Sequence, residues 1–346
     1  MLERIATSPE LYLLRLDFLT LRGCLVPMTE ESYKCSSFLD VRMTRPTNEE
    51  IAIDHRQLAR LSRRLPRRPL QFIFHIGHCG STLLTRMLDE VDGYFVLREP
   101  PLLRVLADAA RQLGHPDCRM RPDDWMDIRN LLLALLSRTW RAHETAVVKP
   151  QSHCNNIMKS LLDWVPQSRG ILLYIDLESY LATMLRPKPR EDTREFVAVR
   201  VTDFHRELDA NFASRSELSE AEQTALIWLI QMYEFRQALS DPELGQRVMP
   251  LNFDDLLADP RSGLTKVCEF LGTPLSEAGS SAALAPRILH RYAKSPEVPL
   301  NAERRNEMLD EARHKYASEI AQGIAWARSM FKLYPELGDP ITGLAD

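Results

Sequence analysis

The 346-residue sequence lacks the features that mark several broad classes of protein. No apolar run approaches the ~20 residues that a membrane-spanning helix needs, so we expect no transmembrane segment. The opening residues, MLERIATSPELYLLRLDFL, include acids and no uninterrupted apolar stretch. This is a poor match to a signal peptide and favours a cytoplasmic protein. Lysine and arginine number 44 and aspartate and glutamate 48, a net charge of −4, so we expect no general affinity for nucleic acid.

Cysteine is also sparse, and its spacing excludes two further classes. The six cysteines, at positions 24, 35, 79, 118, 154 and 268, include no CxxC pair. They are therefore expected to be reduced thiols rather than a disulfide framework or a zinc site. Apolar residues make up 45% and charged residues 27% of the chain, the balance of an ordinary globular protein. The length favours one main core with an appendage.

The pattern of apolar residues divides the chain into three parts. We predict an N-terminal extension over 1–68, an α/β core over 69–275 and a helical C-terminal tail over 276–346. The extension contains an amphipathic segment at Leu11–Leu21, a strand-like stretch, SSFLDVRM, at 36–43, and a helix from about Glu49 to Leu65.

Short buried strands alternate with helices throughout the predicted core. Apolar runs predict five strands, over 70–76, 94–99, 145–150, 170–177 and 247–253. Alternation of this kind indicates an α/β fold in three layers, with a central, mostly parallel sheet between helices. In the helical stretch before the last strand, Trp228 lies at helical spacing from apolar neighbours and is expected in the core.

The first of these strands runs into the loop HIGHCGSTLL, at 75–84. Gly77 and Gly80 allow the backbone to approach a ligand closely, and Ser81 and Thr82 add hydroxyl donors in the first turn of a helix. The start of a helix carries unpaired N–H groups and a partial positive charge. This pattern predicts an anion cradle at the carboxyl end of a strand, although a strand–helix turn without a ligand has the same composition.

The loop lacks the lysine that nucleoside-triphosphate loops carry. In the pattern G-x-x-x-x-G-K-[ST], that lysine reaches the β- and γ-phosphates and the hydroxyl holds Mg²⁺. Here Gly80 is followed directly by Ser81, and the loop is shorter. We therefore expect a loop suited to a single 5′-phosphate group, with no metal.

The loop and three later segments resemble the sulfotransferase superfamily. Its bacterial members often read G-x-[CS]-G-[ST]-T-L-L at the loop. Matching segments follow in the expected order: VLREPP at 96–101, the stretch from VVKP to ATMLR at 147–186, and LNFDDLLADPRSGLTKVCEFLGTPL at 251–275. The resemblance covers about 70–275. It implies a P-loop-like fold that transfers sulfonate from 3′-phosphoadenosine 5′-phosphosulfate (PAPS) to a hydroxyl or amine of a small-molecule acceptor.

The resemblance also assigns roles to residues of the loop. The residues that match the part wrapping the 5′-phosphosulfate are Gly77, Cys79, Gly80, Ser81 and Thr82. His78 stands where members usually carry a lysine or arginine that stabilises the leaving oxygen, and a protonated imidazole would do the same. The alternative is that His78 only caps the turn. A helix N-terminus can lower the pKa of a thiol such as that of Cys79, but we do not expect it to be a nucleophile.

Two further catalytic candidates follow the next two strands. Glu99 lies where an acidic residue takes the acceptor's proton in many members, and its alternative role is a salt bridge with Arg98 or Arg104. Lys149 is a cation at a strand end on the ligand side of the sheet. Its alternative role is that of an edge lysine paired with an acid.

The fourth strand departs from the family pattern. Members carry an arginine there and a serine eight residues later, and both bind the donor's 3′-phosphate. This chain has Ile175, with Thr183 eight residues beyond, so the hydroxyl is retained and the guanidinium is absent. Possible substitutes are other cations nearby: Arg186, Lys188, Arg190, Arg287, Arg291 and Lys294.

Two other functions remain open at this point. A small-molecule kinase or nucleotide-binding protein would use the same fold, although the missing loop lysine argues against it. A non-catalytic protein would retain the scaffold for partners, and the loss of the arginine at 175 is its main support. The HCNN stretch at 153–156 lacks the spacing of metal ligands, and we expect Asn155 or Asn156 to cap the following helix.

Overall fold

A computed structural model describes residues 1–186, 193–208, 218–291 and 301–338. Its centre is a five-stranded sheet in which all neighbouring strands are parallel, confirming the predicted α/β fold. The strands coincide with the five predicted runs and end one to three residues earlier: β4 (Leu70–His75), β5 (Tyr94–Arg98), β6 (Thr145–Lys149), β7 (Gly170–Tyr174) and β8 (Val248–Asn252).

The strand order places the start of the core in the middle of the sheet. The order is β5-β6-β4-β7-β8, so β4 is central and the chain later crosses from β6 on one side of it to β7 on the other. Ligands bind outside the carboxyl ends of strands at such a switch point. The loop that follows β4 therefore lies at the position where an open α/β sheet binds its ligand.

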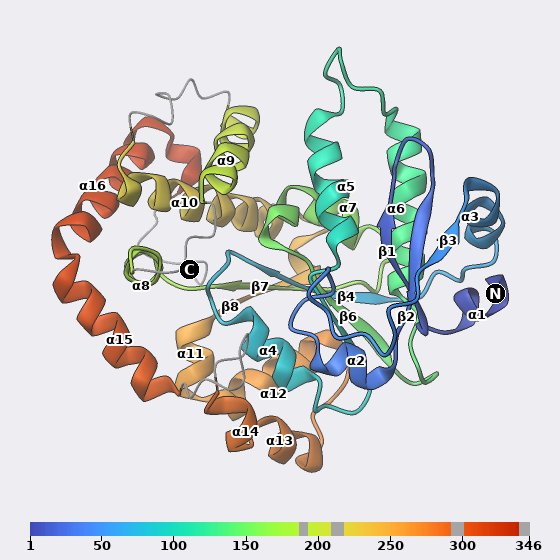
Figure 1. The fold of residues 1–346 in the computed structure, drawn as a ribbon. Coiled ribbons are helices and arrows are strands. Elements are labelled where there is room, and N and C mark those ends of the chain that lie inside the picture. Colours follow the sequence, from blue (N-terminus) through green and yellow to red (C-terminus); the bar gives the residue numbers. More distant parts are fainter. Residues whose placement is uncertain (187–192, 209–217, 292–300, 339–346) are drawn as a thin grey trace.

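Helices cover both faces of this sheet and complete the three layers. In Figure 1, α5, α6 and α7 lie on one face, and α4, α11 and α12 on the other. The helices on and around the core are α4 (Ser81–Leu88), α5 (Pro101–Gln112), α6 (Pro122–Leu136), the 3₁₀ helix η1 (Ser152–Ile157), α7 (Met158–Leu162), α8 (Leu177–Met184), α9 (Thr193–Leu208), α10 (Glu220–Ser240), the 3₁₀ turn η3 (Gly245–Arg247), α11 (Phe253–Ala258) and α12 (Pro260–Leu271).

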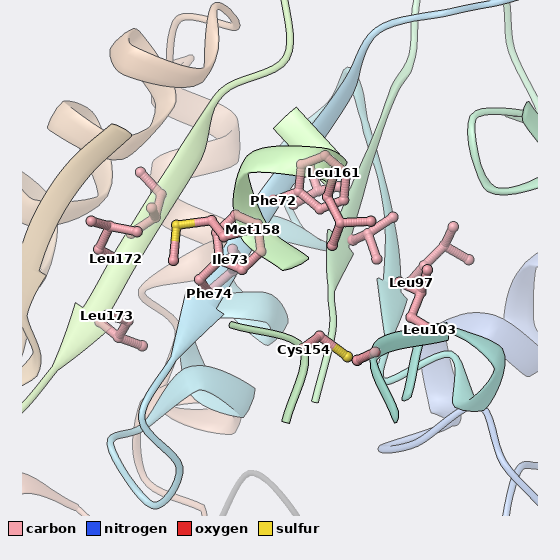
Figure 2. Packing of buried hydrophobic residues seen from close by; sticks show 14 of the residues in the cluster. Phe72, Ile73, Phe74, Leu97, Leu103, Cys154, Met158, Leu161, Leu172 and Leu173 are labelled. Atoms are coloured by element: carbon pink, nitrogen blue, oxygen red, sulfur yellow. The ribbon is translucent and has the colours of Figure 1, made fainter. Parts of the chain in front are cut away.

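The strands are apolar on both sides because both faces of a parallel sheet are covered. Every residue of β4, β5 and β7 is buried. Figure 2 shows Phe72 and Phe74 of β4 beside Met158 and Leu161 of α7. Trp228 on α10 is also in the core, as predicted, with 1% of its surface exposed.

The N-terminal extension differs from its prediction. Instead of one amphipathic element, Leu11–Leu21 forms a strand and a turn, because its side chains are buried on both sides rather than along one helical stripe. The extension forms a separate antiparallel sheet of β1 (Leu11–Leu16), β2 (Gly23–Pro27) and β3 (Ile51–Ile53), with helices α1 (Leu2–Thr7), α2 (Glu30–Cys35) and α3 (His55–Ser62).

Two further predictions for the extension were wrong. The strand-like stretch 36–43 consists of bends and turns, and its backbone N–H at Leu39 bonds to the Arg98 carbonyl at 2.8 Å. The helix expected from Glu49 begins only at His55. Asp54 caps it in a capping box with Gln57, and the three residues before the cap pair with β2 instead.

The extension is held on the core by a buried arginine. Arg138, 3% exposed at the end of α6, donates to the carbonyls of Ile5 at 2.6 Å and Ser8 at 2.8 Å, and to that of Leu11 at 3.2 Å. Burial lowers the pKa of its guanidinium to about 10. These bonds satisfy carbonyls that would otherwise be buried without a partner.

The C-terminal tail is helical, as predicted. It contains α13 (Glu277–Ala283), α14 (Pro286–Leu289), α15 (Ala302–Lys315), α16 (Ala317–Leu333) and the 3₁₀ turn η4 (Pro335–Leu337). Helices α15 and α16 run beside α8 and α10 at one end of the molecule (Figure 1). Among the described helices, none is both long and apolar enough to cross a bilayer.

Candidate functional site

The loop between β4 and α4 has an unusual backbone. Gly77, His78 and Gly80 all have positive φ, at 81°, 52° and 73°. Non-glycine residues rarely adopt this region, and where they do the strain often marks a functional site. In the described part of the chain, three non-glycine residues have positive φ: Leu21, His78 and Glu99. Two of these three are predicted catalytic residues.

Gly80 is required by packing as well as by its backbone angle. A Cβ built on Gly80 would lie 2.0 Å from the ring of Phe253, the first residue of α11. At Gly77 the nearest atom to such a Cβ is the Ser152 hydroxyl oxygen, at 3.7 Å. The loop is therefore pressed against α11 at Gly80, and the side of Gly77 is more open.

A histidine that the sequence analysis did not single out holds the loop in place. His75 Nδ1 accepts a hydrogen bond from the Gly77 N–H at 3.0 Å, and His75 Nε2 lies 3.1 Å from the Pro150 carbonyl. A carbonyl only accepts, so the ring is neutral with its proton on Nε2. The imidazole therefore ties the loop to the residue that follows Lys149.

Three predicted site residues come together beside this loop. Lys149 Nζ lies 2.6 Å from Glu99 Oε1 and 3.3 Å from Thr82 Oγ1. The lysine side chain is fully buried, and 14% of the Glu99 side chain is exposed. Lys149 Nζ also lies 5.7 Å from the centre of the Phe38 ring, so the extension contributes a cation–π contact to the site.

The ion-pair partner of Glu99 is Lys149, which is neither of the two partners suggested by the sequence. Its carboxylate pairs with Lys149, whereas Arg98 forms an ion pair with Asp89 and donates to Thr85 Oγ1 at 3.0 Å. Arg104 pairs with Asp108 instead. Lys149 is indeed paired with an acid, but in the interior of the site rather than at a sheet edge.

Cys79 is a packing residue. It is fully buried, and its thiol donates to the Leu173 carbonyl at 3.3 Å. Burial raises the pKa of the Cys79 thiol to about 11, so the lowering expected from the helix N-terminus is outweighed by desolvation. Its neighbours Ser81 and Thr82 are also buried, and Thr82 is the one whose hydroxyl reaches Lys149.

Position 175, directly after β7, is a core position in this chain. Ile175 is fully buried, and its carbonyl accepts a 2.8 Å hydrogen bond from Trp228 Nε1. The side chain at this position therefore belongs to the core. Thr183 donates its hydroxyl to the Ser179 carbonyl within α8, at 2.7 Å.

Three of the suggested substitute cations lie within the described residues. Arg287 pairs with Glu90 at 2.9 Å, and Arg291 is exposed. Arg186 follows α8 and is partly exposed. The other three suggestions, Lys188, Arg190 and Lys294, lie outside the described residues.

The tail helix α15 brings two other arginines to the strand ends, which the sequence did not suggest. Arg305 Nη1 lies 2.6 Å from Asp254 Oδ1, and its guanidinium stands 5.2 Å from the centre of the Phe253 ring. Arg313 donates to Ser179 Oγ at 3.1 Å. No sequence motif marks these residues, because only the packing of α15 along α8 places them there.

The expected capping role of the two asparagines at 155 and 156 is wrong. Asn155 Nδ2 donates to the His75 carbonyl at 3.3 Å, and Asn156 Nδ2 to the Ala107 carbonyl at 3.1 Å. The segment that follows β6 starts with the 3₁₀ helix η1, and the hydrogen bond of Asn155 connects this helix to the end of β4.

Comparison with known proteins gives matches at the level of structure. No protein-family model and no curated protein matches the sequence. The sulfotransferase domain from the curacin biosynthetic pathway is 14% identical, with 75% of this chain and 98% of that chain covered and a TM-score of 0.43. The sulfotransferase domain from the Synechococcus PCC 7002 olefin synthase is 18% identical, covering 70% of this chain and 94% of that chain, with a TM-score of 0.39.

A third similar structure is retinol dehydratase, solved with androsterone and the inactive cofactor PAP. It is 14% identical, with 83% of this chain and 88% of that chain covered and a TM-score of 0.36. The described chain has the three-layer α/β architecture, with a parallel central sheet, that the sequence predicted.

Proposed function

We propose that this protein is a sulfotransferase that moves a sulfonate group from PAPS to a hydroxyl or amine of a small-molecule acceptor. One observation carries the proposal. Lys149 at the end of β6 and Glu99 just after β5 meet Thr82, from the first turn of α4, beside a loop with three left-handed residues. A cation, a hydroxyl and a carboxylate around an anion cradle are the groups that a sulfonate transfer needs.

The loop would hold the 5′ end of the donor. Close backbone approach is possible at Gly77, which carries no side chain and lies on the more open side of the loop. The first turn of α4 adds the unpaired backbone N–H groups of a helix start. Thr82 and Lys149 would donate to the sulfonate and bridging oxygens, and His78 would face the leaving phosphate. The donor supplies the sulfonate, and no metal takes part in this proposal.

Glu99 is the proposed general base. Its carboxylate is the partly exposed member of the pair with Lys149, so an acceptor can reach it from solvent. The acceptor's O–H or N–H proton would pass to Glu99 as the new bond to sulfur forms. The bond from sulfur to the phosphate oxygen breaks, and adenosine 3′,5′-bisphosphate leaves.

The 3′ end of the donor fits less well. Ile175 is in the core, and Arg305 and Arg313 are already paired with Asp254 and Glu178. Neither Arg305 nor Arg313 is therefore an unpaired guanidinium for a 3′-phosphate. Thr183 remains the candidate hydroxyl, if it turns away from the Ser179 carbonyl.

Titration calorimetry with adenosine 3′,5′-bisphosphate tests the proposal, with Mg-ATP as the competing ligand. We expect saturable binding of the bisphosphate in the micromolar range, with Lys149→Met weakening it at least tenfold. Arg261→Met, which removes an exposed cation of α12, is the matched control and should bind normally. Absence of binding at millimolar bisphosphate, or tighter binding of Mg-ATP, would contradict the proposal and favour the nucleotide-binding alternative.

A further inference from the structure

A row of arginines on the N-terminal extension takes no part in the proposed sulfonate transfer. It lies in the stretch 55–70, which contains no aspartate, glutamate or lysine. The side chains of all six arginines in this stretch are exposed: Arg56, Arg60, Arg63, Arg64, Arg67 and Arg68. We call these six residues the arginine surface.

The helix α3 and the turn after it present the arginine surface to solvent. The helical turn continues beyond the end of α3, because the Leu65 N–H donates to the Leu61 carbonyl at 3.1 Å. One face of this segment is buried against the molecule and carries Leu58, Leu61 and Leu65. The exposed face repeats arginine at every fourth residue, at Arg56, Arg60 and Arg64. Side chains with this spacing have Cβ atoms about 5–6 Å apart, so the guanidinium groups form a row.

The charge of the arginine surface is not neutralised by the chain itself. Among the described residues, none of the six arginines forms an ion pair. By contrast, four other arginines of the extension each pair with a carboxylate: Arg4, Arg15, Arg42 and Arg45. Burial lowers the pKa of the Arg129 guanidinium on α6, and the positive charge of Arg67 lowers it further. The surface therefore carries a positive charge that an anionic partner would neutralise.

The arginine surface lies at the amino end of the central sheet, away from the candidate site. The turn after α3 leads directly into β4, and the Arg68 carbonyl accepts a 3.0 Å hydrogen bond from Trp164 Nε1, in the segment before β7. Figure 1 shows α3 on the opposite side of the molecule from α8, which follows the carboxyl end of β7. Binding at this surface is therefore separate from binding at the loop.

We propose that the arginine surface binds an acidic segment of a partner protein, with aspartate and glutamate carboxylates facing the row of guanidinium groups. Arginine offers five N–H donors in a planar fork that holds a carboxylate with two parallel hydrogen bonds. The helix α3 has eight residues and is about 12 Å long, so the row matches a short segment of polypeptide. Clusters of arginine are a recurring means of recognising acidic motifs.

Two larger anionic partners fit this surface less well. Without these six arginines, the 44 basic residues fall to 38 against 48 acidic ones, a net charge of −10. A nucleic acid or an anionic bilayer that extends past the surface would therefore meet repulsion. The stretch 55–70 has no Phe, Tyr or Trp on which bases could stack. Its leucines on α3 are buried, so they cannot insert into lipid.

Fluorescence anisotropy of the full chain with a labelled acidic peptide tests this inference. The probe is a dodecamer of alternating glutamate and alanine, in ~0.15 M NaCl, where charges more than about 8 Å apart are largely screened. We expect saturable binding by the wild type and a Kd at least about fivefold weaker in Arg60→Gln/Arg64→Gln. The control is Arg119→Gln/Arg328→Gln, which removes two exposed arginines elsewhere with the same change in net charge. It should bind as the wild type does.

A charge reversal separates the effect of charge from an effect on folding. Arg60→Glu/Arg64→Glu should lose the acidic peptide and bind the corresponding lysine–alanine peptide more tightly than the wild type does. Neither double variant at 60 and 64 should change the affinity for adenosine 3′,5′-bisphosphate, so the result does not depend on the proposed function. The inference would be overturned by no saturable binding up to about 1 mM peptide or by an equal loss in the control. Tighter binding of oligouridylate or of phosphatidylserine vesicles would also overturn it.

Discussion

Lys149 and Glu99 form an ion pair in which the lysine is buried and the glutamate reaches solvent. The two residues are adjacent across the sheet, because Lys149 ends β6 and pairs in register with Arg98, the residue before Glu99. The Glu99 N–H also donates to the Lys149 carbonyl, at 2.7 Å. The left-handed backbone of Glu99 therefore aims its carboxylate back toward the ammonium group and the loop.

Substituting Glu99 should lower the rate of the chemical step, whereas substituting Lys149 should weaken ligand binding. Glu99→Gln removes the proposed base and should lower kcat by about 10²–10⁴-fold, the usual range for general base catalysis, with little change in bisphosphate affinity. Lys149→Met should weaken bisphosphate binding. Sulfonate transfer from labelled PAPS to a panel of hydroxyl and amine acceptors, together with calorimetry, measures both. An unchanged kcat in Glu99→Gln would exclude this residue as the base.

Gly80→Ala should destabilise the protein through a steric clash as well as backbone strain. The new methyl group would overlap the Phe253 ring, and we expect a loss of about 3 kcal/mol or more in unfolding free energy. Gly114→Ala is the matched control, since Gly114 also has positive φ, at 85°, but no atom lies within 4 Å of a Cβ there.

Gly114→Ala should therefore cost only the ~1 kcal/mol of left-handed strain. Urea denaturation of both variants gives the comparison. If the two variants lose the same stability, the contact between Gly80 and Phe253 has no energetic consequence.

Restoring an arginine at position 175 should not restore a phosphate contact. Ile175 is fully buried beside Trp228, so Ile175→Arg would place an unpaired guanidinium in the core and destabilise by several kcal/mol, on the order of 3 or more. Bisphosphate affinity should not increase. Ile175→Val, the control, should cost about 0.5–1.5 kcal/mol. A stable variant that binds the bisphosphate more tightly would show that the side chain at 175 can reach the donor.

Position 175 offers no cation to a 3′-phosphate. We therefore expect the protein to distinguish poorly between ligands with and without that phosphate. A charge-assisted guanidinium contact is worth about 1.5–3 kcal/mol, or tenfold to more than a hundredfold in affinity. Because Ile175 provides none, adenosine 3′,5′-bisphosphate and AMP should differ by less than about tenfold in Kd. Competition calorimetry measures the ratio. A preference above a hundredfold would require a cation that lies elsewhere in the chain.

Glu234 should give the folding stability a dependence on pH. Its pKa is raised from 4.5 to about 8 by burial, so the native state retains a proton that the unfolded chain has lost. Stability from this group is fully present below about 4.5 and decreases as the pH rises through about 8, by at most ~1.4 kcal/mol per pH unit. Relative to Glu234→Gln, the wild type should lose stability between pH 5 and 8, as measured by urea denaturation. A constant difference over this range would show that Glu234 is ionised in the native state throughout.

The sequence predicted the core well where local patterns carry the information. Apolar runs bounded by turns located all five parallel strands, because a sheet covered on both faces requires continuous apolar strands. The loop glycines were identified because few residues tolerate left-handed backbone. The extension was predicted poorly. Leu11–Leu16 is buried on both sides, a pattern that does not distinguish a strand from a buried helix.

The sequence by itself determined the fold class and the position of the loop, since both follow from short-range periodicity and glycine placement. Only the tertiary structure determines which charged side chains form ion pairs. Lys149 and Glu99 are 50 residues apart, and strand order makes them partners. For the same reason His75 holds the loop in place, Ile175 is a core residue, and Glu234 is buried beside Arg200. Electrostatic pairs and burial depend on contacts between distant segments, and these form only when the elements pack.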